Sequence, residues 1–203
     1  MMETQDNCQD SEQRILEAAK LVFVKKGMDG AVLQDIADAA QISRTALHYY
    51  FRSKEKLFTA VLDDQLNRTL PRLENIILQD IPFDDKVTRF VEEYLDFLRV
   101  NPYLPNFIMN ELNKHPEPMI KRLSQFGFYS LKTRERFQEE LKEINKDIPA
   151  EQFVMNLISL CIFPFIAKPL VKAFYINGQP DAFDRFIEKR KKHIINILMK
   201  SLR

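Results

Sequence analysis

Residues 35–58 read DIADAAQISRTALHYYFRSKEKLF, and they decide the fold of the first region of the chain. Apolar residues recur here at the spacing of two short helices, with Ile36 on the first and Leu47 on the second. Residues 41–43 form a short turn between them, and Ser43 is placed to N-cap the second helix. This order predicts a helix-turn-helix, whose second helix lies in the major groove of DNA.

The second helix has a polar face whose chemistry suits DNA. Its apolar residues share the opposite face, so by elimination the residues turned to solvent are Arg44, Thr45, His48, Tyr49 and Arg52. Arginine offers a bidentate donor to guanine or phosphate, threonine a hydroxyl and a methyl group, and histidine and tyrosine reach phosphate oxygens. We therefore expect this face to contact DNA.

The net charge of the chain gives no global sign of a polyanionic partner. It is +1, from 30 Lys and Arg against 29 Asp and Glu. Between Gln41 and Phe58, however, four basic residues accompany one acidic residue, Glu55. We expect DNA affinity to rest on this small basic footprint, without a broad basic surface.

A further helix is predicted on each side of the motif. The preceding helix should begin at a capping box of Asp10 and Gln13, after a polar tail over residues 1–10, and end at Gly27. Its apolar stripe is Ile15, Ala18, Ala19, Val22 and Phe23.

The following helix is expected to begin at Ser53. Lys54 lies on its first turn, where the helix dipole disfavours a cation. A phosphate at this terminus would remove the conflict, because free backbone N–H groups and a lysine together bind anions.

The rest of the chain predicts a helical bundle, since no alternating run of strand length occurs and all ten prolines lie at or after Pro71. We expect its helices over residues 54–79, 84–100, 103–114, 117–144, 150–175 and 181–202. The predicted fold class is all-α. It comprises an N-terminal three-helix helix-turn-helix DNA-binding domain, residues 11–55, and a C-terminal helical-bundle domain for ligand binding and dimerisation, residues 56–203.

Several classes of function find no support. The four glycines lie too far apart for the phosphate cradle of a nucleotide-binding enzyme. The three histidines and two cysteines are also scattered, so no metal, cofactor or nucleophilic site is expected, and an enzyme is the least favoured reading. Cys161 is expected to be a buried small apolar residue.

Two features bear on location. The longest uncharged stretch, Phe153–Ala167, is shorter than the roughly 20 residues that span a bilayer, so it is interpreted as a buried core helix. The sparse cysteines and the polar start of the chain predict a cytoplasmic protein with no membrane partner.

The stretch quoted above resembles the DNA-binding signature of the tetracycline-repressor (TetR) family, over about residues 11–60. The Ile36-Ala37 pair, Ser43 in the turn, the aromatic run, Lys54 and the Leu-Phe pair after it fall in register. The length and helical layout of the whole chain are also similar to that family.

The resemblance implies a homodimer that binds double-stranded DNA at a palindromic operator, with half-sites about 34 Å apart or slightly more. It also implies release of DNA when a small-molecule effector binds the C-terminal domain. The expected DNA contacts are Arg44, Thr45, His48 and Tyr49, with Ser43, Tyr50 and Lys54 on phosphates.

Three positions depart from the family pattern. Gln41 stands where glycine is usual in the turn, so it is expected to adopt a left-handed conformation at some cost. Val32 stands where a Thr or Ser commonly opens the second helix, which removes one expected phosphate contact. His48 replaces a tyrosine, so its phosphate contact is expected to depend on pH, because imidazoles titrate near neutrality.

By the resemblance, the middle helices enclose the ligand pocket, and their aromatic residues suit an apolar or planar ligand. The competing interpretation is ordinary core packing, since the aromatic spacing is also that of a core stripe. The expected ligand-binding residues are Phe90, Tyr94, Phe97, Tyr103, Phe107, Asn110, Phe126, Tyr129 and Asn156.

The last two helices are assigned to dimerisation, as halves of a four-helix interface. The alternative is that they close the core of their own protomer. The run over residues 189–193 is basic, and it is interpreted as a solvated helix face. The expected interface residues are Phe183, Phe186, Ile187, Ile194, Ile197 and Leu198.

The leading hypothesis is a dimeric, ligand-responsive repressor. The alternatives are a helical protein that binds hydrophobic ligands without a DNA role, a DNA-binding regulator that needs no ligand, and an activator. The sequence names neither the effector nor the operator nor the regulated genes.

Overall fold

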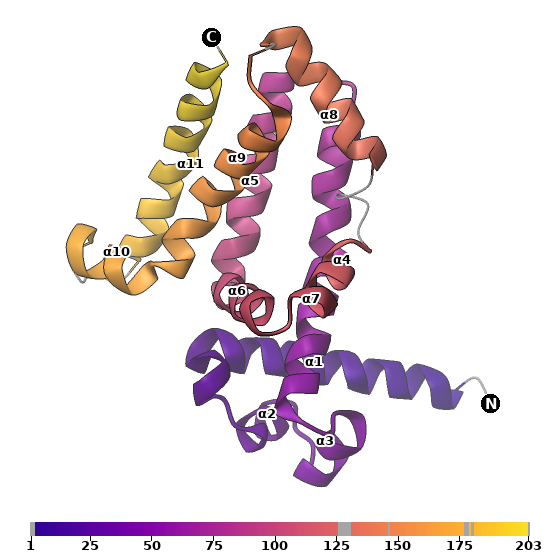
Figure 1. Ribbon diagram of the computed structural model, residues 1–203. Helices are drawn as coiled ribbons and strands as arrows, with labels where there is room; N and C mark the ends of the chain where they lie inside the picture. Colours follow the sequence, from indigo (N-terminus) through magenta and orange to yellow (C-terminus); the bar gives the residue numbers. More distant parts are fainter. Residues whose placement is uncertain (1–2, 126–130, 146, 177–178, 180, 203) are drawn as a thin grey trace. The chain divides into compact units, whose positions relative to one another are not determined.

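The computed structural model describes residues 3–125, 131–145, 147–176, 179 and 181–202. Every regular element within them is an α-helix, so the predicted all-α fold is confirmed (Figure 1). The chain divides into two compact units, Met1–Arg68 and Thr69–Arg203. The division falls inside one long helix, α4 (Lys54–Leu78).

The first unit is built from α1 (Glu3–Gly30), α2 (Leu33–Ala39), α3 (Arg44–Tyr50) and the first turns of α4. The predicted stripe of α1 is buried, and the Phe23 ring meets Phe58 of α4 edge-on, with centroids 4.6 Å apart. Leu47 of α3 is fully buried. Burial of these apolar faces holds the four helices together.

The helix α1 is longer than predicted. It begins at Glu3, so the interpretation of residues 1–10 as a frayed tail, with a cap at Asp10, is wrong. The reason is local, because neither glycine nor proline occurs between Glu3 and Lys26 to stop the helix. At Gly27 the backbone turns to φ 70° and ψ 177°, which breaks the helix at the predicted glycine.

The turn between α2 and α3 closes with two backbone hydrogen bonds. The Ile42 N–H donates to Ala37 O at 3.0 Å, and the Gln41 N–H donates to Asp38 O at 3.1 Å. This pattern is a Schellman motif, which needs a left-handed residue directly after the helix. Gln41 has φ 57°, so the expected left-handed conformation is confirmed.

The second unit surrounds α5 (Phe83–Val100), which packs against α9 and α11, and its inward stripe is buried. In Figure 1, α9 and α11 run beside α5. The other helices of this unit are α6 (Leu104–Lys114), α7 (Pro116–Leu123), α8 (Leu131–Ile144), α9 (Ala150–Ile166), α10 (Lys168–Tyr175) and α11 (Ala182–Ser201).

Two helices that were predicted as single elements are each divided. The predicted helix over 117–144 ends first at Leu123, where the Ser124 hydroxyl donates to Lys121 O at 2.9 Å and competes with the helical bond pattern. The predicted helix over 150–175 breaks at Ala167, and its two parts meet at a bend of 75°. Pro169 explains this break, because it lacks the N–H that a continuing helix needs.

Among the described residues, no single helix is both long and apolar enough to cross a membrane. Only α9 and α10 taken together reach the required length and composition, and they are separated by the bend at Ala167.

The basic run of α11 is not solvated throughout. Lys191 is buried, and its Nζ donates to Asp96 at 2.8 Å and lies 3.0 Å from Glu188. Burial lowers the pKa of Lys191, but the hydrogen bonds to Asp96 and Glu188 outweigh burial and raise the pKa above its ordinary value. The interpretation as a solvated face is therefore wrong for Lys191, which ties α11 to α5.

The left-handed Gln41 predicts the effect of glycine at this position. Gln41→Gly should raise the free energy of unfolding by about 0.5–1 kcal/mol, because glycine adopts this conformation without a Cβ clash but loses more chain entropy on folding. Chemical denaturation followed by circular dichroism measures the change. The matched control is Gln41→Ala, which keeps a Cβ and should leave stability nearly unchanged. Equal stability of the glycine and alanine variants would show that the turn stores no strain.

Candidate functional site

The exposed face of α3 gathers the side chains that were expected to touch DNA. Arg44, Thr45, His48 and Tyr49 are all exposed, and Tyr49 is 82% accessible. The opposite face is anchored by Leu47, which is fully buried. Since one helix face is fixed in the core, the other can present donors to a groove without further rearrangement.

The N-terminus of α3 is capped as predicted. Ser43 Oγ accepts a hydrogen bond from the Ala46 N–H at 3.0 Å, and the hydroxyl proton of Ser43 stays available to a phosphate oxygen. Tyr50, at the other end of α3, is half-buried, and its ring meets the Tyr49 ring edge-on at 5.6 Å. Tyr50 thus supports Tyr49 from behind.

The charge of Lys54, which the dipole of α4 disfavours, is stabilised by backbone carbonyls of the protein itself. Its Nζ lies 3.2 Å from Ala31 O and 3.5 Å from Asp29 O, at the end of α1. A helix C-terminus carries partial negative charge on its free carbonyls, which favours a cation there. Lys54 therefore joins the start of α4 to the end of α1, and its phosphate contact stays a prediction.

The start of α4 is capped independently of Lys54. Ser53 Oγ accepts from the Lys56 N–H at 3.2 Å and so caps the helix at its expected start. Hydrogen bonds from the Glu55 backbone N–H and from Ser53 hold the pKa of Glu55 below its ordinary value.

The start of α2 lacks a side-chain cap, because Val32 occupies the N-cap position and has no polar group. Asp35 replaces the cap from inside the helix. Its Oδ2 accepts from the Val32 N–H at 3.4 Å and from Lys26 Nζ at 2.7 Å, and the Lys26 bond is the main reason that the pKa of Asp35 is lowered. A hydroxyl for a phosphate is missing at this terminus, as expected from Val32.

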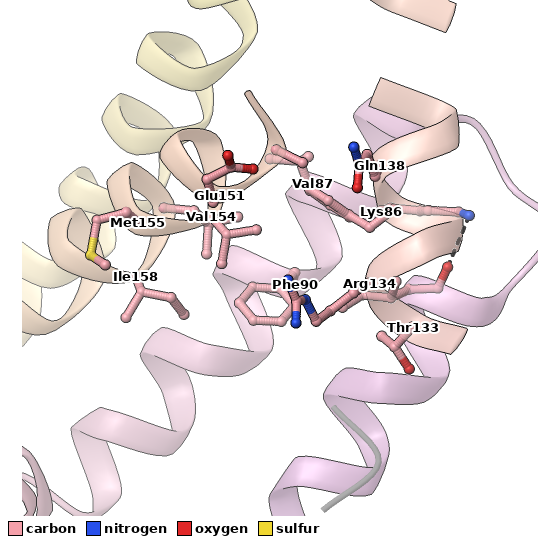
Figure 2. Close-up of a pocket in the computed structure, with 14 residues that line it drawn as sticks. Lys86, Val87, Phe90, Thr133, Arg134, Gln138, Glu151, Val154, Met155 and Ile158 are labelled. Atoms are coloured by element: carbon pink, nitrogen blue, oxygen red, sulfur yellow. Dashed lines mark hydrogen bonds between the residues drawn. The ribbon is translucent and has the colours of Figure 1, made fainter. Parts of the chain in front are cut away.

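The second unit contains a cavity of about 630 Å³ between α4, α5, α8 and α9 (Figure 2). This volume is in the usual range of small-molecule sites. The lining residues are Ile77, Lys86, Val87, Phe90, Thr133, Arg134, Phe137, Gln138, Ala150, Glu151, Val154, Met155, Leu157 and Ile158.

Two polar residues of the lining are engaged in the wall itself. Lys86 is 2% exposed, and its Nζ donates to Glu140 at 2.6 and 2.7 Å and to Ile77 O at 3.0 Å, the bond dashed in Figure 2. Thr133 Oγ1 donates to Glu74 at 3.1 Å. The cavity therefore meets mainly the alkyl stem of Lys86.

The predicted ligand residues are only partly found here. Phe90 lines the cavity, and Phe126 and Tyr129 lie outside the described residues. Six of the expected positions lie outside the lining of this cavity, so their role in ligand binding stays a prediction: Tyr94, Phe97, Tyr103, Phe107, Asn110 and Asn156. Both asparagines are exposed. The lining residues that were missed come mostly from α8 and α9, and helical spacing alone does not tell a cavity wall from core.

The predicted dimer residues divide into two groups. Phe183, Ile187, Ile194 and Leu198 are buried in the core of their own unit, where α11 packs against α5 and α9, which favours the alternative that they close the core of their own protomer. Phe186 is half-buried and Ile197 is 38% exposed. On α9, Phe163 is 59% and Met155 65% exposed, and these apolar positions were not predicted.

No group of three or more His, Cys, Asp or Glu side chains among the described residues is placed to hold a metal ion. Cys161 is fully buried, as predicted, and burial raises the pKa of its thiol to about 12. The thiol is therefore protonated at neutral pH and is a poor nucleophile.

Residues 15–61 match the model of a family described as bacterial regulatory proteins, tetR family. The helix-turn-helix transcriptional regulator TtgR of Pseudomonas putida is 37% identical over 60 residues, or 30% of this chain and 29% of that protein. The chain thus matches less than a third of that relative's length. A probable regulator of Bacillus subtilis, YttP, is 23% identical over 89% of this chain and 90% of that protein.

Two solved structures share the fold. A TetR/AcrR regulator from Thermobifida fusca has a TM-score of 0.66 and 20% identity, over 92% of this chain and 97% of that one. The regulator FadR of Bacillus subtilis, solved with stearoyl-CoA, has a TM-score of 0.61 and 14% identity, over 92% and 96%. At such identities the likeness concerns the fold alone.

Lys54→Ala should lower the free energy of unfolding by about 1 kcal/mol, because two carbonyl oxygens at the end of α1 lose their charged donor. The matched control, Lys56→Ala on the same turn, removes an exposed lysine and should change stability little. Denaturant titration measures both. Duplex binding by the folded Lys54→Ala variant should weaken for all sequences alike. If the two variants are equally stable, the bonds to α1 contribute nothing.

Proposed function

We propose that this chain is a dimeric, sequence-specific DNA-binding transcriptional regulator of the tetR type, because residues 15–61 match the model of the tetR family of bacterial regulatory proteins. In its specific form, the proposal is a cytoplasmic repressor that leaves a palindromic operator when a small apolar or aromatic ligand binds.

The observation that carries the proposal is the exposed face of α3. Arg44, Thr45, His48 and Tyr49 are turned to solvent while Leu47 anchors the helix in the core. These side chains combine a guanine-reading donor with groups that reach phosphates. The excess of basic residues between Gln41 and Phe58 supplies the charge that such binding needs.

The cavity supports an effector site in the second unit. One helix, α4, contributes Phe58 to the core of the first unit and Ile77 to the cavity wall. Suppose that α4 can adopt two positions. A ligand with a higher affinity for one of them would shift the population between DNA-binding and non-binding states. This coupling is the proposed route from effector to operator.

Exposed apolar side chains support a dimer formed by α9 and α11. Phe163 on α9 is 59% exposed, and Ile197 on α11 is 38% exposed. Large apolar groups exposed on helices mark interaction surfaces when they lie together. In a two-fold dimer this surface would pair with itself.

The cavity also favours a second candidate, a protein that binds apolar ligands and has no DNA role. This candidate predicts ligand binding without salt-dependent binding to duplex DNA.

Whether the protein represses or activates transcription is a separate question, since FasR of Mycolicibacterium smegmatis, 29% identical over 85 residues, is named an activator. A promoter-reporter assay with and without the protein decides the sign.

Selection from a pool of random duplexes tests the proposed function directly. The expected result is an enriched palindrome with half-sites about one helical turn apart. Arg44→Ala should cost about 1–3 kcal/mol on the recovered site and relax the preference at one position, because a base-reading fork is lost. The control is Lys25→Ala, which removes an exposed cation of α1, and which should keep the preference. No enrichment by the wild type would refute the proposal.

Phe163→Glu should break the proposed dimer, because it places a charge in an apolar interface. We expect the dissociation constant, measured by analytical ultracentrifugation, to rise at least about tenfold. The control is Ile120→Glu on α7, since Ile120 is 57% exposed but lies on another surface helix. A Phe163→Glu dimer as tight as the wild type would exclude this surface.

A further inference from the structure

We propose that the effector of the cavity is an anionic amphiphile, whose apolar body fills the space between α5, α8 and α9 and whose carboxylate or phosphate head is bound by Arg134. This inference rests on the proposed function, because it specifies the chemistry of the effector that the cavity takes.

The walls of the cavity call for an apolar body. Phe90 and Val87 from α5 face Val154 and Ile158 from α9. Phe137 lines the cavity from α8. These side chains offer no hydrogen bonds. A ligand that displaces water from them gains about 25 cal/mol for each Å² of apolar surface removed from water.

Arg134 is a cation on the wall of this cavity, and it has no counter-ion among the described residues. Its side chain extends from α8 toward Phe90 in Figure 2. Within the described residues, no hydrogen bond or ion pair engages its guanidinium. The stretch 126–132, whose side chains are not described, contains no acidic residue. An anion in the cavity would supply the missing charge.

The other cation of the lining cannot serve this role. Lys86 directs its Nζ into the wall, where both carboxylate oxygens of Glu140 and Ile77 O accept from it. Glu140 also accepts from Arg136 Nε at 3.0 Å, so this carboxylate is shared by two cations and is held in place. Arg134 alone combines a position on the cavity with an uncommitted charge among the described residues.

The position of Arg134 on α8 also makes a nearby anion electrostatically favourable. It lies on the first turn of the helix, whose dipole disfavours a cation, and no acidic residue lies on that turn. A carboxylate or phosphate would interact favourably with both the helix terminus and the guanidinium fork. The planar fork binds either head in a bidentate manner, so the two heads share one chemistry.

Glu151 is the feature that would favour the opposite ligand, a cation. It lines the cavity from α9, but in Figure 2 its carboxylate points away from Phe90. It also borders a smaller adjoining hollow of about 160 Å³, together with Lys142 and Asp147. Glu151 therefore turns its charge away from the apolar wall at Phe90, while the Arg134 side chain extends toward that wall.

Four probes with one ten-carbon chain test the proposal: decanoate, decyl phosphate, decanol and decylamine. Their binding to the full-length protein without DNA is measured by isothermal titration calorimetry. We expect at least one of the two anions to bind about tenfold or more tighter than decanol, since a charge-assisted pair with arginine is lost in the alcohol. The better anion tells which head the site takes.

Arg134→Gln should abolish this preference and leave decanol binding unchanged, because the chain-binding walls are intact. The matched control is Lys142→Gln, which removes an exposed cation of the same helix that borders only the smaller hollow. It should keep the preference for anions. Arg134 is exposed, so its replacement is not expected to disturb folding, and circular dichroism checks this.

Three results would overturn the inference: decanol binding as tightly as both anions, an anion preference that persists in Arg134→Gln, or decylamine as the tightest probe, with its binding lost in Glu151→Gln. Failure of the proposed function looks different. An anion that binds through Arg134 but does not release the protein from its operator refutes effector-driven release and leaves the assignment of Arg134 standing.

Discussion

The left-handed backbone of Gln41 sets the direction in which α3 leaves α2. The two hydrogen bonds of the Schellman turn form only when this residue has a positive φ, and Gln41 adopts φ 57° although it carries a Cβ. Once the turn is closed, Leu47 falls into the core and the polar face of α3 is left outside. The proposed DNA surface therefore depends on one strained residue and one buried leucine.

The helix α4 is the element on which the two halves of the proposed mechanism converge. Near its start, Phe58 packs on Phe23, and Lys54 holds the last carbonyls of α1. Near its end, Ile77 lines the cavity, and its carbonyl accepts from Lys86. If an effector displaced α4, the displacement would change the contacts of this helix with α1 near its start and with Lys86 near its end.

The first region from α2 to the start of α4 could be predicted from the sequence almost residue by residue, whereas the start of α1 and the second region could not. Short helices with clear caps, such as Ser43 before α3, carry their signals within a few residues. The breaks at Ser124 and Ala167 were missed, although Pro169 is a local signal for the second of them. Likewise, Lys191 sits in a basic run that gives no local sign of its burial.

The sequence by itself determined the helix-turn-helix and the exposed face of α3, since each follows from periodicity and capping among neighbouring residues. The left-handed turn at Gln41 was expected from the resemblance to the TetR family. The tertiary structure decided which side chains line the cavity and which close the core, because helical spacing marks an apolar face but not what lies opposite it. It also decided the partners of the cations. Lys54 finds carbonyls more than 20 residues away, and Lys191 of α11 finds Asp96 of α5. Such pairings depend on how distant helices pack, and no local pattern encodes them.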